Sequence, residues 1–306
     1  LKASNLNPRK PTGLLIYNLD GKQVQFLPGG TPNNVDIRYD FSYGKVLIPL
    51  IAVSHWYSGD VSLHTIDNET MKVQTLMGEH IKTGLDQLRG LCMFKDLENG
   101  AFYYFVLNKQ GNVEQYEILQ GEKLATQLVR AFKLKTRAEG CVADDLYNVV
   151  YLAEEVRGIW KFSARPADDI GSLIAETSWF GPLRAEVEGL TIYDDRHGGG
   201  YIVASSQRND RFVVYDRKSN RYISRFRVVD STWIDGVSHT DGIDISNVGI
   251  GPVFKKGIFV AHDNVNTDKE GRKLNQNFKL INWSEIEKMM ANELMKSPSY
   301  EHGVGP

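Results

Sequence analysis

The sequence predicts an all-β fold, a six-bladed β-propeller of four-stranded blades that ends in one short C-terminal helix. Three observations support this prediction. A motif with a charged residue recurs along the chain at nearly constant intervals. Between these motifs the chain reads as short apolar strands joined by tight turns, and long helical patterns between the strands are absent.

The recurring motif is clearest as Asp241-Gly-Ile-Asp244. Toward the N-terminus it is repeated at Glu188, Glu139, Arg89 and, without the glycine, Asp36, at intervals of 53, 49, 50 and 53 residues. Such a period is typical of repeat architectures. If the repeats surround an axis, these positions face one central place, and four of the five are carboxylates. If each acid instead caps its own turn, they do not meet.

A carboxylate cluster must take up protons or bind a cation, because like charges repel. Ca²⁺ accepts about six to eight oxygen ligands with loose geometry. The repeat therefore predicts a calcium site.

Strand positions follow from local signals. A strand is expected at Gly13–Asp20, where Asp20-Gly21 forms a hairpin turn. The run Val46–Val53 is continuously apolar, as in a strand covered on both faces, and Pro49 within it predicts a bulge. Later units repeat a pair of strands around turns at 108–111, 154–158 and 207–210.

The two ends of the chain differ from this repeat. A helix is expected over Trp283–Met295, with Ser284 as its N-cap. The strand at Gly13–Asp20 belongs to a sixth blade whose start would lie before Leu1, so the start of the first blade is missing. The chain is then either truncated or naturally incomplete, and an incomplete blade predicts lower stability or a partner that covers its edge. We treat residues 1–306 as one propeller domain, and a second propeller domain in a longer parent chain is a candidate partner.

Composition excludes several classes of protein. The 306 residues are 42% hydrophobic, which is enough for a sizeable core. A formal net charge of −2 without a basic run argues against nucleic acid as a partner. No apolar run approaches the roughly 20 residues needed to span a bilayer, and no signal peptide is recognisable. Cys92 and Cys141 follow two blade starts, and we interpret them as small buried hydrophobic residues, although they could also pair.

Six motifs then carry a resemblance to a known family. They are Asn33–Phe41, Glu139–Asp145, Ala153–Glu155 with Ile159–Phe162, Glu188–Tyr193, Asp241–Asp244 and Asn275–Lys279. Together they resemble the β-propeller phytases, the alkaline, calcium-dependent family of Bacillus type, in matching order from about Pro11 to Trp283. The resemblance implies six blades, several Ca²⁺ ions in an acidic funnel, and hydrolysis of myo-inositol hexakisphosphate by a calcium-bridged water. It also implies a secreted or periplasmic protein.

The resemblance assigns roles to single residues. The positions that match calcium ligands at the cleavage site are Glu139, Glu155, Glu188, Asp235 and Asp241. Lys10 and Lys109 match lysines that hold phosphates, and the backbone carbonyl of Val35 matches a ligand of a structural calcium. Lys109 also lies in a hairpin turn, where a solvated lysine is common. Because both the substrate and this site are anionic, cations must mediate binding.

The chain departs from the family at several positions. Where the family has an arginine after the strand that ends at Val53, this chain has His55-Trp56. Arg89 stands where a tyrosine is usual, and we expect it to replace the missing arginine as a bidentate phosphate ligand. The chain also lacks the family's Asp-Asp-Pro-Ala motif, and it differs from the usual family residue at Pro11, His239 and Val265.

Three functions remain open at this point. The first is a calcium-dependent phosphomonoesterase acting on a small polyphosphorylated substrate, phytate or lower inositol phosphates. The second is a catalytically weak propeller that binds inositol phosphates or a partner domain. The third is another calcium-dependent propeller hydrolase, such as a lactonase or phosphotriesterase. Lys109 and the five acids favour the first over the third.

Overall fold

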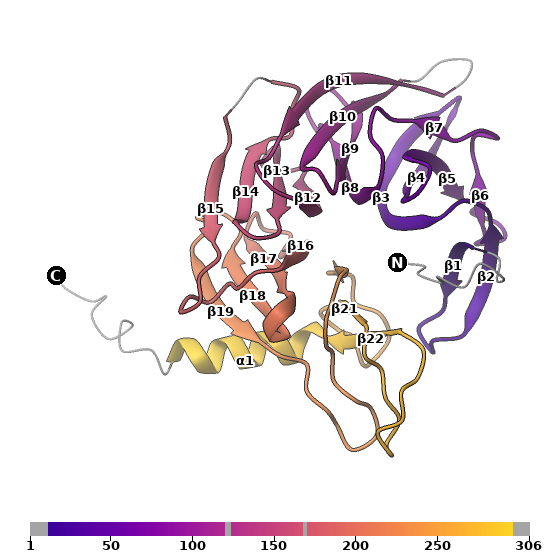
Figure 1. The fold of residues 1–306 in the computed structure, drawn as a ribbon. Coiled ribbons are helices and arrows are strands. Elements are labelled where there is room, and N and C mark those ends of the chain that lie inside the picture. The colour runs from indigo at the N-terminus through magenta and orange to yellow at the C-terminus, as the bar shows by residue number, and fades with distance from the viewer. Residues whose placement is uncertain (1–11, 120–123, 168–169, 296–306) are drawn as a thin grey trace. The chain divides into compact units, whose positions relative to one another are not determined.

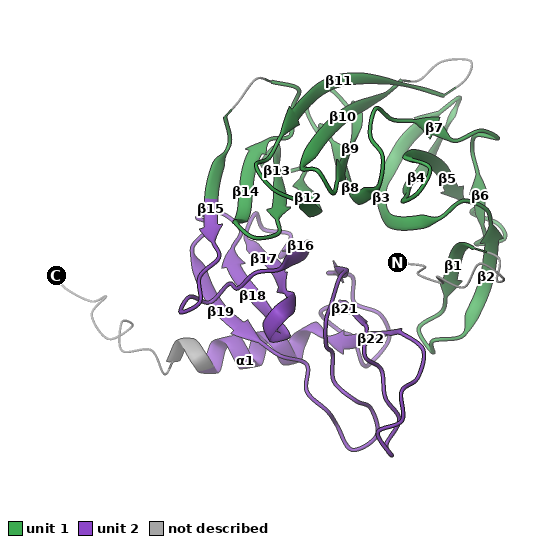
Figure 2. Ribbon diagram, viewed as in Figure 1, with its two compact units in different colours: residues 1–173 green, residues 174–306 purple. Residues whose placement is uncertain are grey.

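The computed structural model describes residues 12–119, 124–167 and 170–295, in two compact units that we describe separately (Figure 1; Figure 2). The first unit comprises residues 1–173 and the second residues 174–306. Lys10 and Pro11, which the sequence analysis singled out, lie outside the described residues. In the described part of the chain, no helix is long and apolar enough to cross a membrane.

The first unit opens with a two-stranded antiparallel sheet and continues with a larger one. In the two-stranded sheet, β1 (Gly13–Tyr17) pairs with β2 (Gln23–Pro28), and Gly21 in the turn between them has a positive φ, as the predicted hairpin requires. The second sheet has the order β3 (Pro32–Tyr43), β4 (Val46–His55), β5 (Asp60–Ile66), β6 (Val73–Thr75), and β7 (Ile81–Lys82) also pairs with β5.

Two four-stranded sheets follow in up-and-down order (Figure 1). The first consists of β8 (Leu88–Lys95), β9 (Phe102–Asn108), β10 (Asn112–Leu119) and β11 (Ala125–Lys133). The second consists of β12 (Ala138–Asp144), β13 (Val149–Glu154), β14 (Gly158–Ser163) and β15 (Ser172–Glu176), and the first unit ends within β15.

The sheets of the first unit are packed as neighbouring blades. Their first strands lie next to one another, since β8 contacts both β3 and β12. Apolar side chains from adjacent sheets fill the space between them; one cluster includes Leu63 and Tyr104, and the next includes Phe105 and Leu152. This is the packing of propeller blades, in which each sheet buries its faces against the next.

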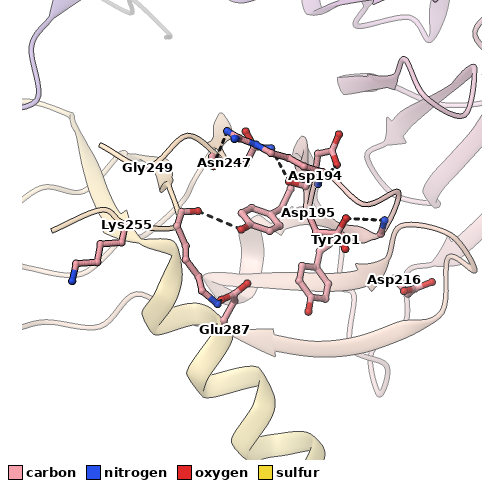
Figure 3. A pocket seen from close by; sticks show the side chains of 13 residues that line it. Asp194, Asp195, Tyr201, Asp216, Asn247, Gly249, Lys255 and Glu287 are labelled. Atoms are coloured by element: carbon pink, nitrogen blue, oxygen red, sulfur yellow. Dashed lines mark hydrogen bonds and ion pairs between the residues drawn. The ribbon is translucent and has the colours of Figure 1, made fainter. Parts of the chain in front are cut away.

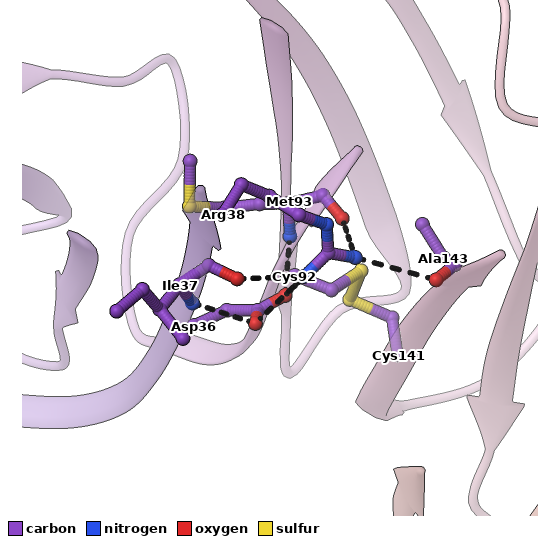
Figure 4. Close-up of a disulfide and its surroundings, with 7 residues drawn as sticks. All are labelled: Asp36, Ile37, Arg38, Cys92, Met93, Cys141 and Ala143. Carbon is purple, nitrogen blue, oxygen red and sulfur yellow. Dashed lines mark hydrogen bonds and ion pairs between the residues drawn. A yellow bond between two sulfur atoms is a disulfide. The ribbon is translucent and has the colours of Figure 1, made fainter. Parts of the chain in front are cut away.

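A disulfide joins two of these first strands. Cys92 of β8 and Cys141 of β12 are bonded, with their Cα atoms 5.7 Å apart (Figure 4). The interpretation of these cysteines as unpaired hydrophobic residues is therefore wrong. Strands separated by 49 residues in sequence are neighbours here, and sequence spacing alone could not show that their side chains face each other.

The second unit contains two sheets and the helix. One sheet has the order β16 (Val187–Asp194), β17 (Gly200–Ser206), β18 (Arg211–Asp216), β19 (Tyr222–Phe226), with a 3₁₀ turn at Gln207–Asn209. The other consists of β20 (Ile243–Ser246), β21 (Ile258–Asp263) and β22 (Asn277–Asn282). Helix α1 (Trp283–Met295) follows β22 and contacts β19 as well, and the buried Trp283 stacks on Tyr193 at 4.3 Å between ring centroids.

Local predictions were confirmed with one exception. Pro49 lies opposite the β3 segment where the β3–β4 register shifts, which is the predicted irregularity. Helix α1 covers the predicted range, but its first turn is capped by Asn282, whose Oδ1 accepts a hydrogen bond from the Ser284 N–H at 3.1 Å. The predicted cap at Ser284 is therefore wrong by two residues. The blade-like sheets confirm an all-β propeller, whereas closure by six blades stays a prediction.

Candidate functional site

The first strand of several blades begins with a β-bulge that carries a predicted site residue. In β8 the register shifts between Leu88 and Gly90, so Arg89 lies in the bulge. Comparable shifts place Glu139 in the bulge of β12 and Glu188 in that of β16. A bulge leaves one residue out of the hydrogen-bonded ladder and can redirect its side chain. The periodic motif in the sequence is thus a periodic bulge in the structure.

Adjacent bulges within a unit are in close contact. A Cβ atom at Gly90 would clash with the carbonyl oxygen of Glu139, and one at Gly189 would lie 2.9 Å from the carbonyl oxygen of Asp241. These glycines are needed because the next segment passes against their backbone. The glycine after the charged residue is therefore a packing requirement, and it keeps the charged positions of one unit side by side.

Asp36 does not lie in a bulge, although the sequence repeat aligned it with Arg89, Glu139 and Glu188. At the start of β8, the residue of β3 that contacts Arg89 is Asn33, whose Nδ2 donates to the Arg89 carbonyl at 3.0 Å. Asp36 lies further along β3, where it accepts a hydrogen bond from the Met93 N–H at 2.8 Å and pairs with Arg38 at 3.0 Å (Figure 4). The prediction that Asp36 aligns with Arg89 is wrong, because the bulges change the residue count along each strand.

In the first unit, two of the predicted calcium ligands meet at one guanidinium. Arg137 contacts Glu155 through two nitrogens, each 3.1 Å from a carboxylate oxygen, and its Nε lies 3.6 Å from Oε1 of Glu139. Both carboxylates are buried. Arg137 thus offsets the repulsion between two buried carboxylates, and calcium binding by Glu139 and Glu155 stays a prediction.

Glu154 positions this pair and was not predicted. Its fully buried carboxylate accepts hydrogen bonds from Thr136, through the backbone N–H at 2.6 Å and the hydroxyl at 2.9 Å, and from the indole of Trp160 at 2.7 Å. These bonds fix the loop that carries Arg137 against the end of β13. The dipeptide Glu154-Glu155 in the sequence shows two acids but not which one is structural.

The predicted phosphate-binding residues of the first unit differ in their surroundings. Lys109 lies exposed in the β9–β10 turn, and in the described structure its ammonium group makes no ion pair. The guanidinium carbon of Arg89 lies 4.5 Å from the ring centroid of Trp56. Val35 pairs with Val53 in the β3–β4 ladder, and a calcium bound to its carbonyl stays a prediction.

In the second unit, Glu188 has an acidic neighbour that the sequence analysis missed. Glu186 and Glu188 each offer a carboxylate oxygen, and the two oxygens lie within 4.8 Å of each other. Glu188 is buried, and Glu186 also pairs with Arg208 at 2.9 Å. The only signal for Glu186 in the sequence is its position two residues before Glu188.

Asp235 is neutralised by a buried lysine. Lys279 Nζ donates to Asp235 and lies 3.2 Å from Asp263, and the Thr267 N–H donates to Asp235 at 2.7 Å. Burial by itself would raise the pKa of Asp235, but the hydrogen bonds from Lys279 and Thr267 outweigh burial and hold this pKa below its ordinary value. Asp235 is therefore ionised and already paired.

Asp241 belongs to a different group of side chains. It accepts a hydrogen bond from Gln207 Nε2 at 2.9 Å, and its other oxygen lies 3.5 Å from Nδ1 of the buried His262. The two acids that the sequence analysis grouped, Asp235 and Asp241, thus have separate partners in the second unit.

A pocket of about 640 Å³ in the second unit lies apart from these residues (Figure 3). Its lining includes Asp194, Tyr201, Asp216 and a Lys256–Glu287 ion pair of 2.6 Å. Because no residue predicted from the sequence lines it, we do not assign it to the candidate site.

Comparison with known proteins gives the same assignment as the motifs. The Phytase family model matches residues 2–302. The chain is 39% identical over 312 residues to the 3-phytase of Bacillus subtilis (strain 168), covering all of this chain and 80% of that protein. Among solved structures, a functionally unknown protein from Desulfotomaculum acetoxidans DSM 771 has a TM-score of 0.50 and 14% identity, covering 71% of this chain and 64% of that one. That last similarity concerns the fold alone.

The family match spans nearly the whole chain and includes every acid of the candidate site. Paired carboxylates beside basic side chains are consistent with a phosphoric monoester hydrolase. The chain belongs to the phytase family and is a phytase-like hydrolase.

Proposed function

We propose that this protein is a calcium-dependent phosphomonoesterase that hydrolyses phytate or lower inositol phosphates by means of a calcium-activated water. The observation that carries the proposal is the grouping of carboxylates within each unit, of which Glu139, Glu155 and Glu188 are buried. Glu139 and Glu155 share one guanidinium in the first unit, and Glu186 lies beside Glu188 in the second. The match to a 3-phytase supplies the substrate class.

The donor atoms fit calcium. All of the paired groups are carboxylates, which are the oxygen ligands that Ca²⁺ prefers. Buried carboxylates this close require a positive charge, and in the first unit Arg137 shows where one is accommodated. Calcium held by such carboxylates would lower the pKa of a bound water and offset the charge that develops on a phosphoryl group.

Three of the predicted ligands pair with a basic side chain in the described structure, Asp235 with Lys279 and both Glu139 and Glu155 with Arg137. We propose that these three carboxylates hold calcium together with Glu188 and Asp241. Lys109 and Arg89 carry positive charge without a carboxylate partner in the described structure, which suits them to hold substrate phosphates. In this proposal the chain's own cations orient the phosphates, and the carboxylates hold the metal.

The disulfide supports a location outside the cytosol. Cys92 and Cys141 form a stable cross-link only under oxidising conditions, such as those of the periplasm or the exterior of the cell. We therefore propose a secreted or periplasmic protein.

The decisive experiment measures phosphate release from phytate and from an inositol tetrakisphosphate, at mildly alkaline pH, with millimolar Ca²⁺ or with EDTA. Wild-type protein is compared with Glu188→Gln and with Glu69→Gln, which changes an exposed glutamate in the turn after β5. We expect release that requires calcium, is abolished in Glu188→Gln and is unchanged in Glu69→Gln.

The other outcomes separate the alternatives. Release that EDTA does not reduce would contradict the calcium proposal. No release from either substrate, with calcium still raising the melting temperature, would favour a binding module for inositol phosphates over an enzyme.

A further inference from the structure

Arg89 is the exception among the arginines of the first unit. The other described arginines there each lie within hydrogen-bond or ion-pair distance of an oxygen; they are Arg38, Arg130, Arg137, Arg157 and Arg165. The Nε atom of Arg89 is buried without a hydrogen-bond partner, and its guanidinium makes no ion pair with any described residue. A guanidinium is always charged and has five N–H donors, so leaving a buried donor without a hydrogen bond costs free energy.

Among the described residues, the contact that this guanidinium makes is aromatic. Its central carbon lies 4.5 Å from the centroid of the Trp56 ring, within the range of a cation–π interaction. Trp56 in turn stacks on Tyr57, with ring centroids 5.1 Å apart and planes 5° apart. A flat ring supports the guanidinium without using any of its N–H donors, so the terminal NH₂ groups remain available to a ligand.

The loop that carries Trp56 is fixed by hydrogen bonds to Thr31. The Trp56 N–H donates to the Thr31 carbonyl at 2.9 Å, and the Tyr57 N–H donates to the Thr31 hydroxyl at 3.2 Å. The preceding residue, His55, accepts a hydrogen bond from the Thr31 N–H through Nδ1 at 3.1 Å. The ring therefore has a defined position before any ligand arrives, and this reduces the entropy cost of ordering Arg89.

The position of Arg89 relates it to the carboxylates of the first unit. Arg89 lies in the bulge of β8, and the adjacent Gly90 packs directly against the backbone of Glu139 in the bulge of β12. The disulfide joins the same two strands a few residues further along, which holds the two bulges at a fixed separation.

We infer that Trp56 and Arg89 form a phosphoryl clamp, in which Trp56 is a positioning residue that presents the guanidinium of Arg89 to two oxygens of a substrate phosphate. A planar fork of N–H donors matches the non-bridging oxygens of a phosphoryl group in a bidentate way. The inference rests on the proposed function and adds a residue to it. It predicts that Trp56 affects substrate binding only by positioning Arg89.

The test is a double-mutant cycle on the full chain, using Trp56→Ala, Arg89→Ala and both together. For phytate hydrolysis with calcium, we expect Trp56→Ala to raise KM by about three- to thirtyfold, the range of a desolvated cation–π contact, with a smaller change in kcat. In the Arg89→Ala background, Trp56→Ala should change KM by less than about twofold, because the guanidinium it positions is gone.

Three further variants make the result specific. Trp56→Phe should restore most of the affinity, because a phenyl ring still supports a guanidinium. Arg89→Lys should not, because an ammonium group lacks the planar fork. Tyr43→Ala removes an exposed aromatic ring at the far end of β3 from His55 and serves as the matched control, with KM expected within about twofold of wild type. Melting temperatures of all variants show whether the fold is retained.

A binding measurement separates this inference from the proposed function. Inorganic phosphate is titrated by calorimetry, so no turnover is needed. If no ester is hydrolysed but Trp56→Ala and Arg89→Ala weaken phosphate binding to the same extent, the clamp stands and the enzymatic proposal fails. If Trp56→Ala binds phosphate and substrate like wild type, or if the two single effects multiply in the double variant, the inference is overturned.

Discussion

Removal of the Cys92–Cys141 disulfide should destabilise the protein by an amount that follows from the length of chain it closes. The two cysteines are 49 residues apart in sequence. In the chain-entropy treatment, a cross-link that closes a loop of this length removes about 14 cal/mol/K from the unfolded state, or about 4 kcal/mol at 25 °C. We therefore expect Cys92→Ala/Cys141→Ala to lose about 4 kcal/mol of unfolding free energy.

Urea unfolding measures this loss. With an m value of about 3 kcal/mol/M, the midpoint should fall by about 1.3 M in the double variant, and by a similar amount when a reductant is added to wild-type protein. Reductant should not shift the midpoint of the variant, which serves as its own control. Equal midpoints for oxidised wild type and the variant, or two free thiols titrated in unfolded wild-type protein, would refute the reasoning.

Three other predictions concern buried charge. Burial holds the pKa of His55 and His64 at about 4, so between about pH 6.5 and 4 the unfolded chain binds more protons than the folded one. The free energy of unfolding should therefore fall on acidification, by on the order of 3 kcal/mol per imidazole. A urea midpoint that does not change between pH 7.5 and 5 would contradict this. Glu154→Gln should lower the free energy of unfolding by about 2 kcal/mol, because an NH₂ group replaces a carboxylate oxygen that accepts hydrogen bonds from Thr136 or Trp160. An unchanged melting temperature would argue against this role of Glu154. Lys279→Met should lower the free energy of unfolding by about 3 kcal/mol or more, because it removes the cation that pairs with the buried Asp263 and the partly buried Asp235. Added calcium should restore part of the melting temperature if these carboxylates accept it, and a variant as stable as wild type without calcium would exclude the pairing.

The fold could be predicted from the sequence because its signals are local and repeated. A strand, a turn and a second strand recur at each hairpin, and the Lys109 turn was located from four residues alone. The cap of α1 was misplaced because Asn282 and Ser284 are both good capping residues, and only the backbone shows which one precedes the first turn.

The site could be predicted only in part. Acids were found because they recur at the start of the repeat, and Glu139 and Glu188 each lie in the bulge of a first strand. The basic partners were missed because nothing in the sequence links Arg137 to Glu155 or Lys279 to Asp235; these pairs form through loops whose course depends on tertiary packing. Asp36 was misplaced because the repeat interval was counted in residues, whereas bulges insert extra ones.

The bulge at the start of β3, β8, β12 and β16 has a consequence for how such proteins diversify. A residue outside the hydrogen-bonded ladder can change its chemistry without disturbing the sheet, and here this position holds an asparagine in β3, an arginine in β8 and glutamates in β12 and β16. Each of these four strands therefore offers one site where selection, or an engineer, can exchange charge independently of the others. Substrate preference could be altered blade by blade while the scaffold stays constant.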